Sequence, residues 1–278
     1  MHNLRYKLIV SDLDGSLLNG EGAISGRTLK AIEGYHAAGG LFTYATGRSE
    51  KSAAVFVEQA GIKIPGISFN GGKVFDHRDG CVIYETFLDV DKSKETYISI
   101  RKLKKDIIIY FDDARYVAEY TAVIDKYLER VRHEVIILRD IEQVFGGAKA
   151  LKKLLIIDPK QEGDIIINTV KPIFGGSFNF VKSDPEYYEI LPLGTSKGRA
   201  LEALAEHLGI ELGSVIAIGD HLNDVPMIEA AGLGVAVANA EPEAIAAAGY
   251  ITASNTDDGV ALVIEKLLQG QLPGQQLN

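Results

Sequence analysis

Strand-like and helix-like patterns alternate over the first part of the chain. Short apolar runs indicate strands, and between them apolar residues recur every three or four positions, which is typical of helices with one buried face. The predicted strands are residues 6–11, 41–45 and 67–69, and the predicted helices are residues 26–38 and 49–59. Strands that alternate with helices predict βαβ units and a parallel sheet.

The pattern changes in the middle of the chain and returns after Gly194. Residues 73–76 and 81–85 flank an Asp79-Gly80 turn, which predicts a hairpin. The middle segment predicts helices at 91–104, 121–130 and 162–170 and strands at 107–111, 115–118, 149–157, 179–182 and 187–191. The last segment predicts helices at 196–207, 225–231, 242–248 and 258–268 and strands at 215–218 and 234–237. We therefore expect one α/β domain, residues 1–86 and 190–278, split by an inserted α+β domain of residues 87–189.

Composition and charge narrow the class of protein. The chain has 46% hydrophobic and 24% charged residues, which is typical of a globular protein. Its net charge of -9 argues against nucleic acid or an anionic membrane as the main partner, because both favour basic surfaces. Cys81 is the only cysteine, so no internal disulfide can form. No apolar run approaches the ~20 residues of a membrane helix, and the first residues do not resemble a signal peptide. We expect a cytoplasmic protein.

Two aspartates follow the first predicted strand. Asp12 and Asp14 come directly after residues 6–11, and Gly15 follows them. In an open parallel sheet, ligands bind beyond the carboxyl ends of the strands. Carboxylates that converge in a tight turn suit Mg²⁺, a hard cation that prefers oxygen ligands. Aspartates with this spacing are also common in solvated turns, so the pattern needs support from elsewhere in the chain.

Two further patterns lie at predicted helix starts. Thr46, Gly47 and Arg48 follow the second strand, where a hydroxyl and free backbone N–H groups can bind an anion. Lys197 lies at the start of the helix predicted at 196–207, where a cation opposes the helix dipole, and such local conflicts often mark function. Taken alone, the first pattern is more typical of a helix cap, and the second is more typical of a surface lysine.

The fourth pattern follows the strand predicted at 215–218. Asp220 stands at the strand end, and Asn223 and Asp224 follow it by three and four positions. These side chains can gather at one metal ion, although they are also typical of a helix cap. Four such patterns in this order rarely occur together by chance.

These segments resemble the four motifs of the haloacid dehalogenase superfamily. The matching segments are DLDGSLL at 12–18, ATGR at 45–48, SKG at 196–198 and GDHLNDVPM at 219–227. The similarity is greatest to the Cof-type phosphatases, which carry a large α+β cap between the second and third motifs. Asn70-Gly71-Gly72 and NTDDG at 255–259 also resemble that group. Ser16 departs from the usual threonine but keeps its hydroxyl.

The resemblance implies a fold and a mechanism. The fold is a Rossmann-like parallel-sheet core with an inserted cap. Asp12 would attack phosphorus and become an aspartyl phosphate, while Asp14 would protonate the leaving oxygen and then deprotonate water. Mg²⁺ would be held by Asp12, by the backbone carbonyl of Asp14 and by Asp220, with Asp224 helping through water.

The resemblance also implies a phosphate-binding set. Thr46 and the N–H of Gly47 would hold phosphate oxygens, and Lys197 and Asn223 would complete the set. Arg48 would contact the substrate. Position and positive charge of this kind are the main means by which proteins stabilise a phosphoryl-transfer transition state.

The sequence is compatible with several functions. We expect an Mg²⁺-dependent phosphatase that acts on a small phosphorylated metabolite, with sugar phosphates favoured. The alternatives are a phosphosugar mutase of the same superfamily, a non-catalytic metabolite-binding module and a receiver-like signalling domain. The presence of Asp12, Asp14 and Lys197 argues against the binding module, and the long insertion argues against the receiver. Either a monomer or a homodimer is compatible with the sequence.

Overall fold

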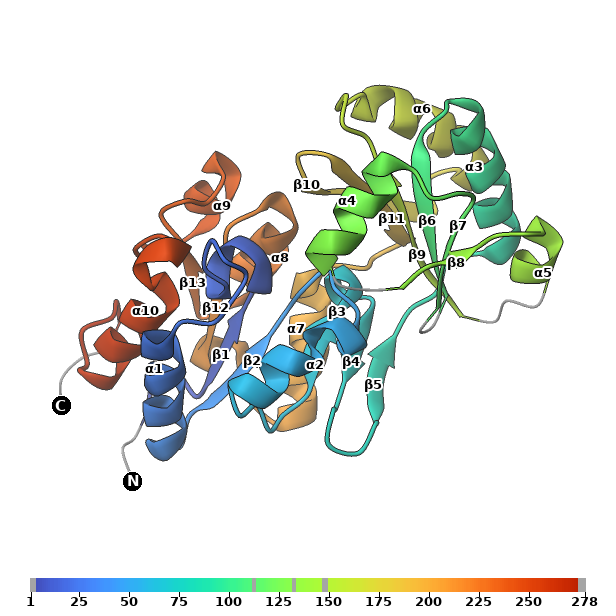
Figure 1. The fold of residues 1–278 in the computed structure, drawn as a ribbon. Coiled ribbons are helices and arrows are strands. Elements are labelled where there is room, and N and C mark those ends of the chain that lie inside the picture. The colour runs from blue at the N-terminus through green and yellow to red at the C-terminus, as the bar shows by residue number, and fades with distance from the viewer. Residues whose placement is uncertain (1–3, 112–113, 132–133, 147–149, 275–278) are drawn as a thin grey trace. The chain divides into compact units, whose positions relative to one another are not determined.

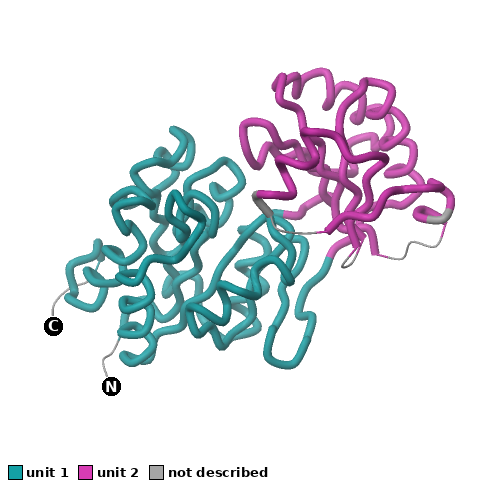
Figure 2. Tube along the Cα trace, in the orientation of Figure 1, with its two compact units in different colours: residues 1–85, 196–278 teal, residues 86–195 magenta. Residues whose placement is uncertain are grey.

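The computed structural model describes residues 4–111, 114–131, 134–146 and 150–274. It divides into two compact units, shown in Figure 2. The first unit comprises Met1–Glu85 and Ser196–Asn278, and the second comprises Thr86–Thr195. Segments from both ends of the chain thus build one unit, and the continuous segment between them builds the other.

A five-stranded parallel sheet lies at the centre of the first unit, in the order β14-β13-β12-β1-β2 (Figure 1). Its strands are β1 (Leu8–Ser11), β2 (Leu41–Tyr44), β12 (Val215–Gly219), β13 (Leu233–Ala236) and β14 (Tyr250–Ile251). Leu8 of β1 lies opposite Leu41 of β2 on one side and Val215 of β12 on the other. All residues of β1 and β12 are buried, as expected for a parallel sheet covered on both faces. The predicted parallel sheet is confirmed.

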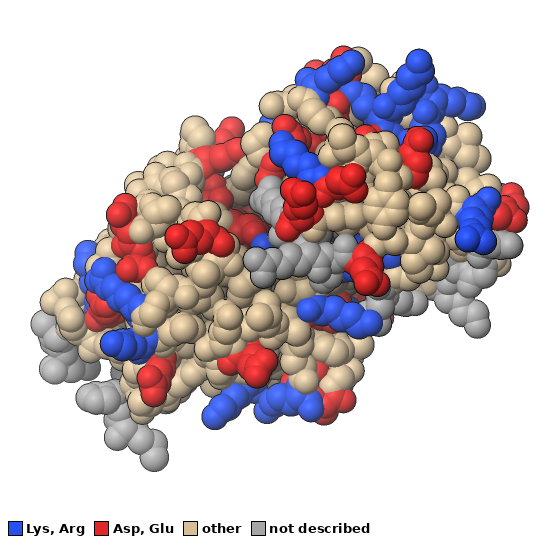
Figure 3. Space-filling model, viewed as in Figure 1, with Lys and Arg blue, Asp and Glu red and all other residues tan. Residues whose placement is uncertain are grey.

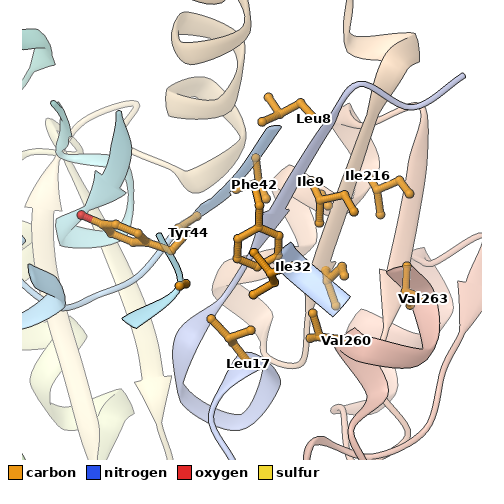
Figure 4. Packing of buried hydrophobic residues seen from close by; sticks show 14 of the residues in the cluster. Leu8, Ile9, Leu17, Ile32, Phe42, Tyr44, Ile216, Val260 and Val263 are labelled. Atoms are coloured by element: carbon orange, nitrogen blue, oxygen red, sulfur yellow. The ribbon is translucent and has the colours of Figure 1, made fainter. Parts of the chain in front are cut away.

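Helices cover this sheet. They are α1 (Gly26–Ala37), α2 (Glu50–Gln59), α7 (Lys197–Leu208), α8 (Val225–Ala230), α9 (Pro242–Ala247) and α10 (Gly259–Leu268). α1 packs on α10, and α7 packs on α8. Figure 4 shows Ile32 of α1 and Val260 of α10 among the side chains around Phe42 of β2. Serines at 25, 49 and 196 cap α1, α2 and α7 by accepting a backbone N–H from the first turn, which fixes where these helices begin.

The strand predicted at 67–69 does not continue the parallel series. β3 (Gly66–Ser68), β4 (Lys73–Phe75) and β5 (Val82–Glu85) form a separate antiparallel sheet. A parallel bridge between Ala45 and Ile67 links this sheet to the end of β2. Three consecutive residues with positive φ, Phe69 (54°), Asn70 (55°) and Gly71 (95°), lie between β3 and β4, where the chain reverses direction and the antiparallel pairing begins.

The second unit contains a six-stranded sheet in the order β10-β11-β9-β6-β7-β8, antiparallel except for the β7–β8 pair. Its strands are β6 (Asp106–Phe111), β7 (Ala114–Val117), β8 (Ile136–Ile137), β9 (Leu151–Ile157), β10 (Phe178–Asp184) and β11 (Tyr187–Pro192). Its helices are α3 (Val90–Lys102), α4 (Ala122–Val131), α5 (Ile141–Phe145) and α6 (Gly163–Phe174). A core separate from that of the first unit includes residues from α3, α6 and the sheet.

Three details of the second unit differ from the sequence prediction. The helix predicted at 162–170 continues through Pro172 and ends at Phe174, where Gly175 in the left-handed conformation caps it. Sequence reasoning missed the short elements β8 and α5. The strand predicted at 149–157 begins at Leu151 in the structure, and its first predicted residue, Lys149, lies outside the described residues.

The distribution of surface charge and the length of the helices bear on possible partners. On the face drawn in Figure 3, Lys and Arg side chains lie in separate groups among acidic ones. Among the described residues, no helix is both long enough and apolar enough to cross a membrane.

Candidate active site

Asp12 lies where three strands of the first unit end together. Its backbone N–H donates to the carbonyl oxygen of Ile218 in β12 at 2.8 Å, and the N–H of Ala45, just after β2, donates to the carbonyl oxygen of Ser11 at 2.9 Å. The Asp12 residue is 6% exposed. The sheet register thus brings the segments after β1, β2 and β12 to one edge, where ligands bind in open parallel sheets.

Lys197 joins two aspartates that come from opposite ends of the chain. Its Nζ donates to Oδ1 of Asp12 at 2.7 Å and to Oδ1 of Asp224 at 2.5 Å. The Lys197 side chain is completely buried. These two ion pairs offset the unfavourable position of a cation at the start of α7 and explain why a lysine is held there.

Asp220 completes a group of three carboxylates. Asp12, Asp220 and Asp224 each offer one oxygen, and these oxygens lie within 4.8 Å of one another. Asp224 is fully buried, and its Oδ2 accepts the backbone N–H groups of Asp220 at 2.9 Å and His221 at 3.0 Å. Asp224 therefore shapes the turn after β12 as well as pairing with Lys197.

The turn Leu13–Leu17 fits closely against Asp220. Gly15 has φ = 83°, and a Cβ added there would lie 2.3 Å from Oδ2 of Asp220. A side chain at this position is excluded by both the backbone conformation and the carboxylate. Ser16 donates its hydroxyl to Oδ1 of Asp220 at 2.7 Å. The serine at this position thus supplies the hydroxyl that holds Asp220.

Asp14 pairs with Arg48 rather than with the carboxylate cluster. Nε of Arg48 donates to Oδ2 of Asp14 at 2.7 Å, and Nη2 donates to Oδ1 at 2.6 Å. The side chain of Asp14 is 34% exposed. Its carboxylate is not one of the three within 4.8 Å of one another, so metal binding through its backbone carbonyl stays a prediction. The same holds for substrate binding by Arg48, whose guanidinium is engaged by Asp14 here.

The remaining predicted residues meet through Asn70. The carbonyl oxygen of Thr46 accepts the N–H of Asn70 at 2.9 Å, and the Thr46 hydroxyl accepts the N–H of Arg48 at 3.2 Å. Nδ2 of Asn223 donates to Oδ1 of Asn70 at 2.9 Å. A Cβ added at Gly47 would lie 3.1 Å from the same amide group. The second and fourth motifs are therefore connected by one asparagine.

Sequence reasoning missed this connecting role. Asn70 belongs to a segment that resembles the Cof-type pattern, and its sequence context holds a signal for its backbone conformation. Asparagine is one of the few residues other than glycine that tolerate the left-handed conformation, and it precedes Gly71 and Gly72 directly after a strand. In addition, a Cβ added at Gly71 would lie 2.1 Å from the carbonyl oxygen of Ser196, so the turn also fits against the start of α7.

Burial and the mutual charges of the cluster shift the pKa values of its members. Burial raises the pKa of Asp12 well above its ordinary value of 3.8; Lys197 lowers it, and the neighbouring carboxylates raise it further. Burial, with the charge of Asp224, raises the pKa of Asp220 to about 7. Burial alone would lower the pKa of Lys197, but Asp12 and Asp224 raise it above its ordinary value. Three carboxyl groups share one ammonium group, so the cluster would carry an excess of negative charge if all three were ionised.

A divalent cation fits this arrangement. Three convergent carboxylates supply the hard oxygen ligands that Mg²⁺ prefers, and the close approach of Gly15 leaves a defined position for the carboxylate of Asp220. A cation would also favour the ionised forms of the carboxylates whose pKa values burial raises.

Comparisons with known proteins identify the family to which the chain is similar. The family model described as haloacid dehalogenase-like hydrolase matches residues 9–264. The 5-amino-6-(5-phospho-D-ribitylamino)uracil phosphatase YwtE of Bacillus subtilis is 32% identical over 295 residues, which cover 95% of this chain and 99% of that protein. The HMP-PP phosphatase of Serratia proteamaculans is 27% identical over 242 residues, covering 86% of each. A haloacid dehalogenase-like hydrolase from Bacteroides thetaiotaomicron, 28% identical, superposes with a TM-score of 0.85 over 94% of this chain and 99% of that one.

Proposed function

We propose that this chain, which belongs to the haloacid dehalogenase-like hydrolase family and is a phosphatase, removes phosphate from a small phosphorylated metabolite through a covalent intermediate on Asp12. One observation carries the proposal. Buried Asp12 lies at the end of β1, is ion-paired to Lys197 and has Asp220 and Asp224 beside it. This combination supplies a nucleophile, a fixed positive charge and a place for a cation.

We propose Mg²⁺ as the cofactor. Asp12 and Asp220 would hold it, with the backbone carbonyl of Asp14, and Asp224 would act through water. When bound, Mg²⁺ supplies positive charge that offsets the repulsion between the carboxylates and the phosphate. The excess of carboxylates over cations in the cluster supports this assignment.

The chain's own residues would carry out two transfers. In the first, an oxygen of Asp12 bonds to phosphorus, the ester bond breaks, and the leaving oxygen takes a proton from Asp14. In the second, water bonds to phosphorus, Asp14 takes its proton, and the bond between phosphorus and Asp12 breaks to release phosphate. Throughout both, Lys197 holds the position of Asp12, and its charge opposes the negative charge on the phosphate oxygens.

Two relatives support a proposal for the chemical class of the substrate. YwtE is named for a substrate that carries a phosphorylated ribityl group, and the Serratia proteamaculans relative is an HMP-PP phosphatase. We propose a phosphorylated sugar or sugar alcohol as the preferred class. We also propose that Thr86–Thr195 acts as the cap domain and supplies the contacts that select among substrates.

A panel of phosphorylated metabolites tests the proposed function. Phosphate release is measured colorimetrically with Mg²⁺ and with EDTA, using sugar phosphates, nucleotides and cofactor phosphates. We expect Mg²⁺-dependent release that is highest with sugar phosphates. Chromatography of the organic product separates hydrolysis from isomerisation, since a mutase would return an isomeric phosphate. Absence of phosphate release from every compound would refute the proposal.

Asp14→Asn should lower kcat by about 10²- to 10⁴-fold, because general acid–base catalysis contributes factors of that size. Its affinity for Mg²⁺ should fall by a much smaller factor than kcat, because only the backbone carbonyl of Asp14 is assigned to the cation and the variant loses only the more distant charge of the side chain. Steady-state kinetics and titration calorimetry measure the two quantities.

A matched control lies between α1 and α10. Arg27 donates to Glu265 from Nε at 2.9 Å and from Nη2 at 2.7 Å, which is the same arrangement that Arg48 makes with Asp14. Glu265→Gln should leave kcat unchanged. Normal turnover by Asp14→Asn would contradict the assignment of Asp14 as the acid and base.

Mg²⁺ binding should strengthen as the pH rises through about 7. The folded Asp220 carboxyl keeps its proton up to a pKa of about 7, whereas the unfolded chain loses it near 3.8. Without metal, the folded state therefore binds more protons in this window, and the free energy of unfolding falls as the pH rises. A cation competes with that proton, so the stabilisation by Mg²⁺ should be larger at pH 8 than at pH 5.

Thermal unfolding with EDTA or Mg²⁺ at several pH values measures this effect. Asp220→Asn has no carboxyl at this position, so it should weaken both the pH dependence and the stabilisation by Mg²⁺. Equal stabilisation of the unchanged protein by Mg²⁺ at pH 5 and pH 8 would count against Asp220 as a ligand.

A further inference from the structure

Two asparagines from the C-terminal part of the chain hold the turn that follows Asp12. Nδ2 of Asn239 donates to the carbonyl oxygen of Gly15 at 2.9 Å. Nδ2 of Asn255 donates to the carbonyl oxygen of Leu18 at 2.7 Å. The backbone N–H of Asn255 donates to Oδ1 of Asn239 at 2.9 Å, which connects the two residues. We refer to Asn239 and Asn255 as the asparagine pair.

The turn held in this way controls the position of a proposed ligand. Gly15 has no space for a Cβ beside Asp220, and Ser16 donates to Oδ1 of Asp220 at 2.7 Å. On the other side, the N–H of Glu241 donates to the carbonyl oxygen of Asp220 at 2.7 Å, two residues along the chain from Asn239. A shift of the Gly15 carbonyl would therefore displace the groups that fix the Asp220 carboxylate.

We propose that Asn239 and Asn255 are positioning residues for the cation site. The inference rests on the proposed function. It adds two residues whose amide groups bond to the backbone of the turn after Asp12 and to each other. Their amide groups hold both ends of the segment from Gly15 to Leu18, so that the backbone after Asp12 and the carboxylate of Asp220 keep one arrangement. Binding sites lose affinity when such supporting hydrogen bonds are lost, because the ligand groups are no longer preorganised.

The NTDDG segment gains a role from this arrangement. Asn255 is its first residue, and the turn Asn255–Asp257 leads into α10. Ser254 caps that turn by accepting the N–H of Asp257, and the N–H of Gly259 donates to the carbonyl oxygen of Ser254 at 2.9 Å. The backbone that carries Asn255 is thus fixed locally before its side chain reaches Leu18.

Substitutions at Asn239 test the inference. Asn239→Leu has a similar volume and lacks both the donor and the acceptor, whereas Asn239→Asp lacks only the donor. We expect each to weaken Mg²⁺ binding about two- to tenfold, the factor that corresponds to one hydrogen bond. Titration calorimetry of the substrate-free protein measures the affinity directly, and the Mg²⁺ concentration for half-maximal phosphate release measures it during turnover. At saturating Mg²⁺, kcat should fall by a smaller factor.

The charge of the aspartate variant sharpens the test. An added carboxylate near a cation site would by itself tighten cation binding. Weaker binding by Asn239→Asp therefore runs against the added charge and identifies the loss of the hydrogen bond to Gly15. A role confined to stability would instead lower the unfolding temperature in EDTA and leave the Mg²⁺ affinity unchanged.

Asn19 provides the matched control. It lies next to Leu18, and its Oδ1 accepts the N–H groups of Glu21 at 3.0 Å and Ala23 at 3.1 Å. Asn19→Asp adds the same charge and keeps both hydrogen bonds, so its Mg²⁺ affinity should not fall.

Two outcomes would overturn the inference. In the first, both Asn239 variants bind Mg²⁺ as tightly as the unchanged protein does. In the second, the unchanged protein does not bind Mg²⁺. A protein that binds Mg²⁺ but releases no phosphate from any compound would refute the proposed function alone. The calorimetric comparison would then still decide the role of the asparagine pair.

Discussion

Asp12→Asn is expected to abolish phosphate release, with a loss of at least about 10⁴-fold, because only binding and electrostatic effects remain when a nucleophile is removed. The unchanged protein should also form an acid-stable phosphoprotein after rapid quenching with labelled substrate, and the variant should not. The unfolding temperature of the variant in EDTA should be measured beside its activity, because Asp12 is also an ion-pair partner of the buried Lys197. Loss of activity without loss of stability would separate chemistry from folding.

Asp76 offers a buried aspartate for comparison in the same unit. It is 3% exposed and pairs with Arg78 at 2.6 Å. Asp76→Asn should retain kcat and lose some stability, because Arg78 lowers the pKa of Asp76 and the ionised form therefore stabilises the fold. Measurable turnover or a labelled phosphoprotein in Asp12→Asn would show that another residue is the nucleophile.

Lys197→Met is expected to lower kcat by about 100- to 1,000-fold, the range seen when one charge-stabilising donor is removed. It should also reduce the free energy of unfolding in EDTA, by about 3–5 kcal/mol, because Asp12 and Asp224 lose the cation with which they are buried. Methionine has a similar length, so packing is largely kept. Mg²⁺ should restore part of the stability but not the rate. Urea unfolding and steady-state kinetics measure the two effects.

Lys105 in the second unit is the matched control, because it also bridges two carboxylates. Its Nζ donates to Asp158 at 2.6 Å and to Glu162 at 2.5 Å. Lys105→Met should lose stability, although less than Lys197→Met because the side chain of Glu162 is 41% exposed, and kcat should stay within about twofold. A kcat for Lys197→Met within tenfold of the unchanged protein would exclude Lys197 from the chemical step.

The sequence was sufficient to predict the parallel sheet and the segments that meet at its edge. Apolar periodicity located β1, β2 and β12, and parallel strands place their carboxyl ends at one edge, so Asp12, Thr46 and Asp220 had to lie near one another. The position of Lys197 at a predicted helix start and the family resemblance both singled out this residue, but neither indicated its complete burial between two aspartates. The catalytic roles of these residues stay predictions.

Other features depend on side-chain contacts that periodicity does not encode. Asp14 and Arg48 carry opposite charges in separate motifs, and nothing in their spacing indicates that they bond to each other. The turn at Phe69 and Asn70 ends the parallel series through backbone conformations that a hydrophobic pattern does not reveal. The roles of Asn239 and Asn255 likewise depend on backbone carbonyls that belong to a different part of the chain.

The pairing of β1 with β12 has a consequence for synthesis of the protein. The ribosome releases β2 soon after β1, but β12 follows only after the whole of Thr86–Thr195 has been made. Until then, the backbone N–H and C=O groups along one edge of β1 lack their partners in β12. The nascent chain also has neither the lysine nor the later aspartates that Asp12 needs beside it. Premature termination in that interval would therefore yield an inactive fragment that is prone to aggregation, since unpaired strand edges favour aggregation.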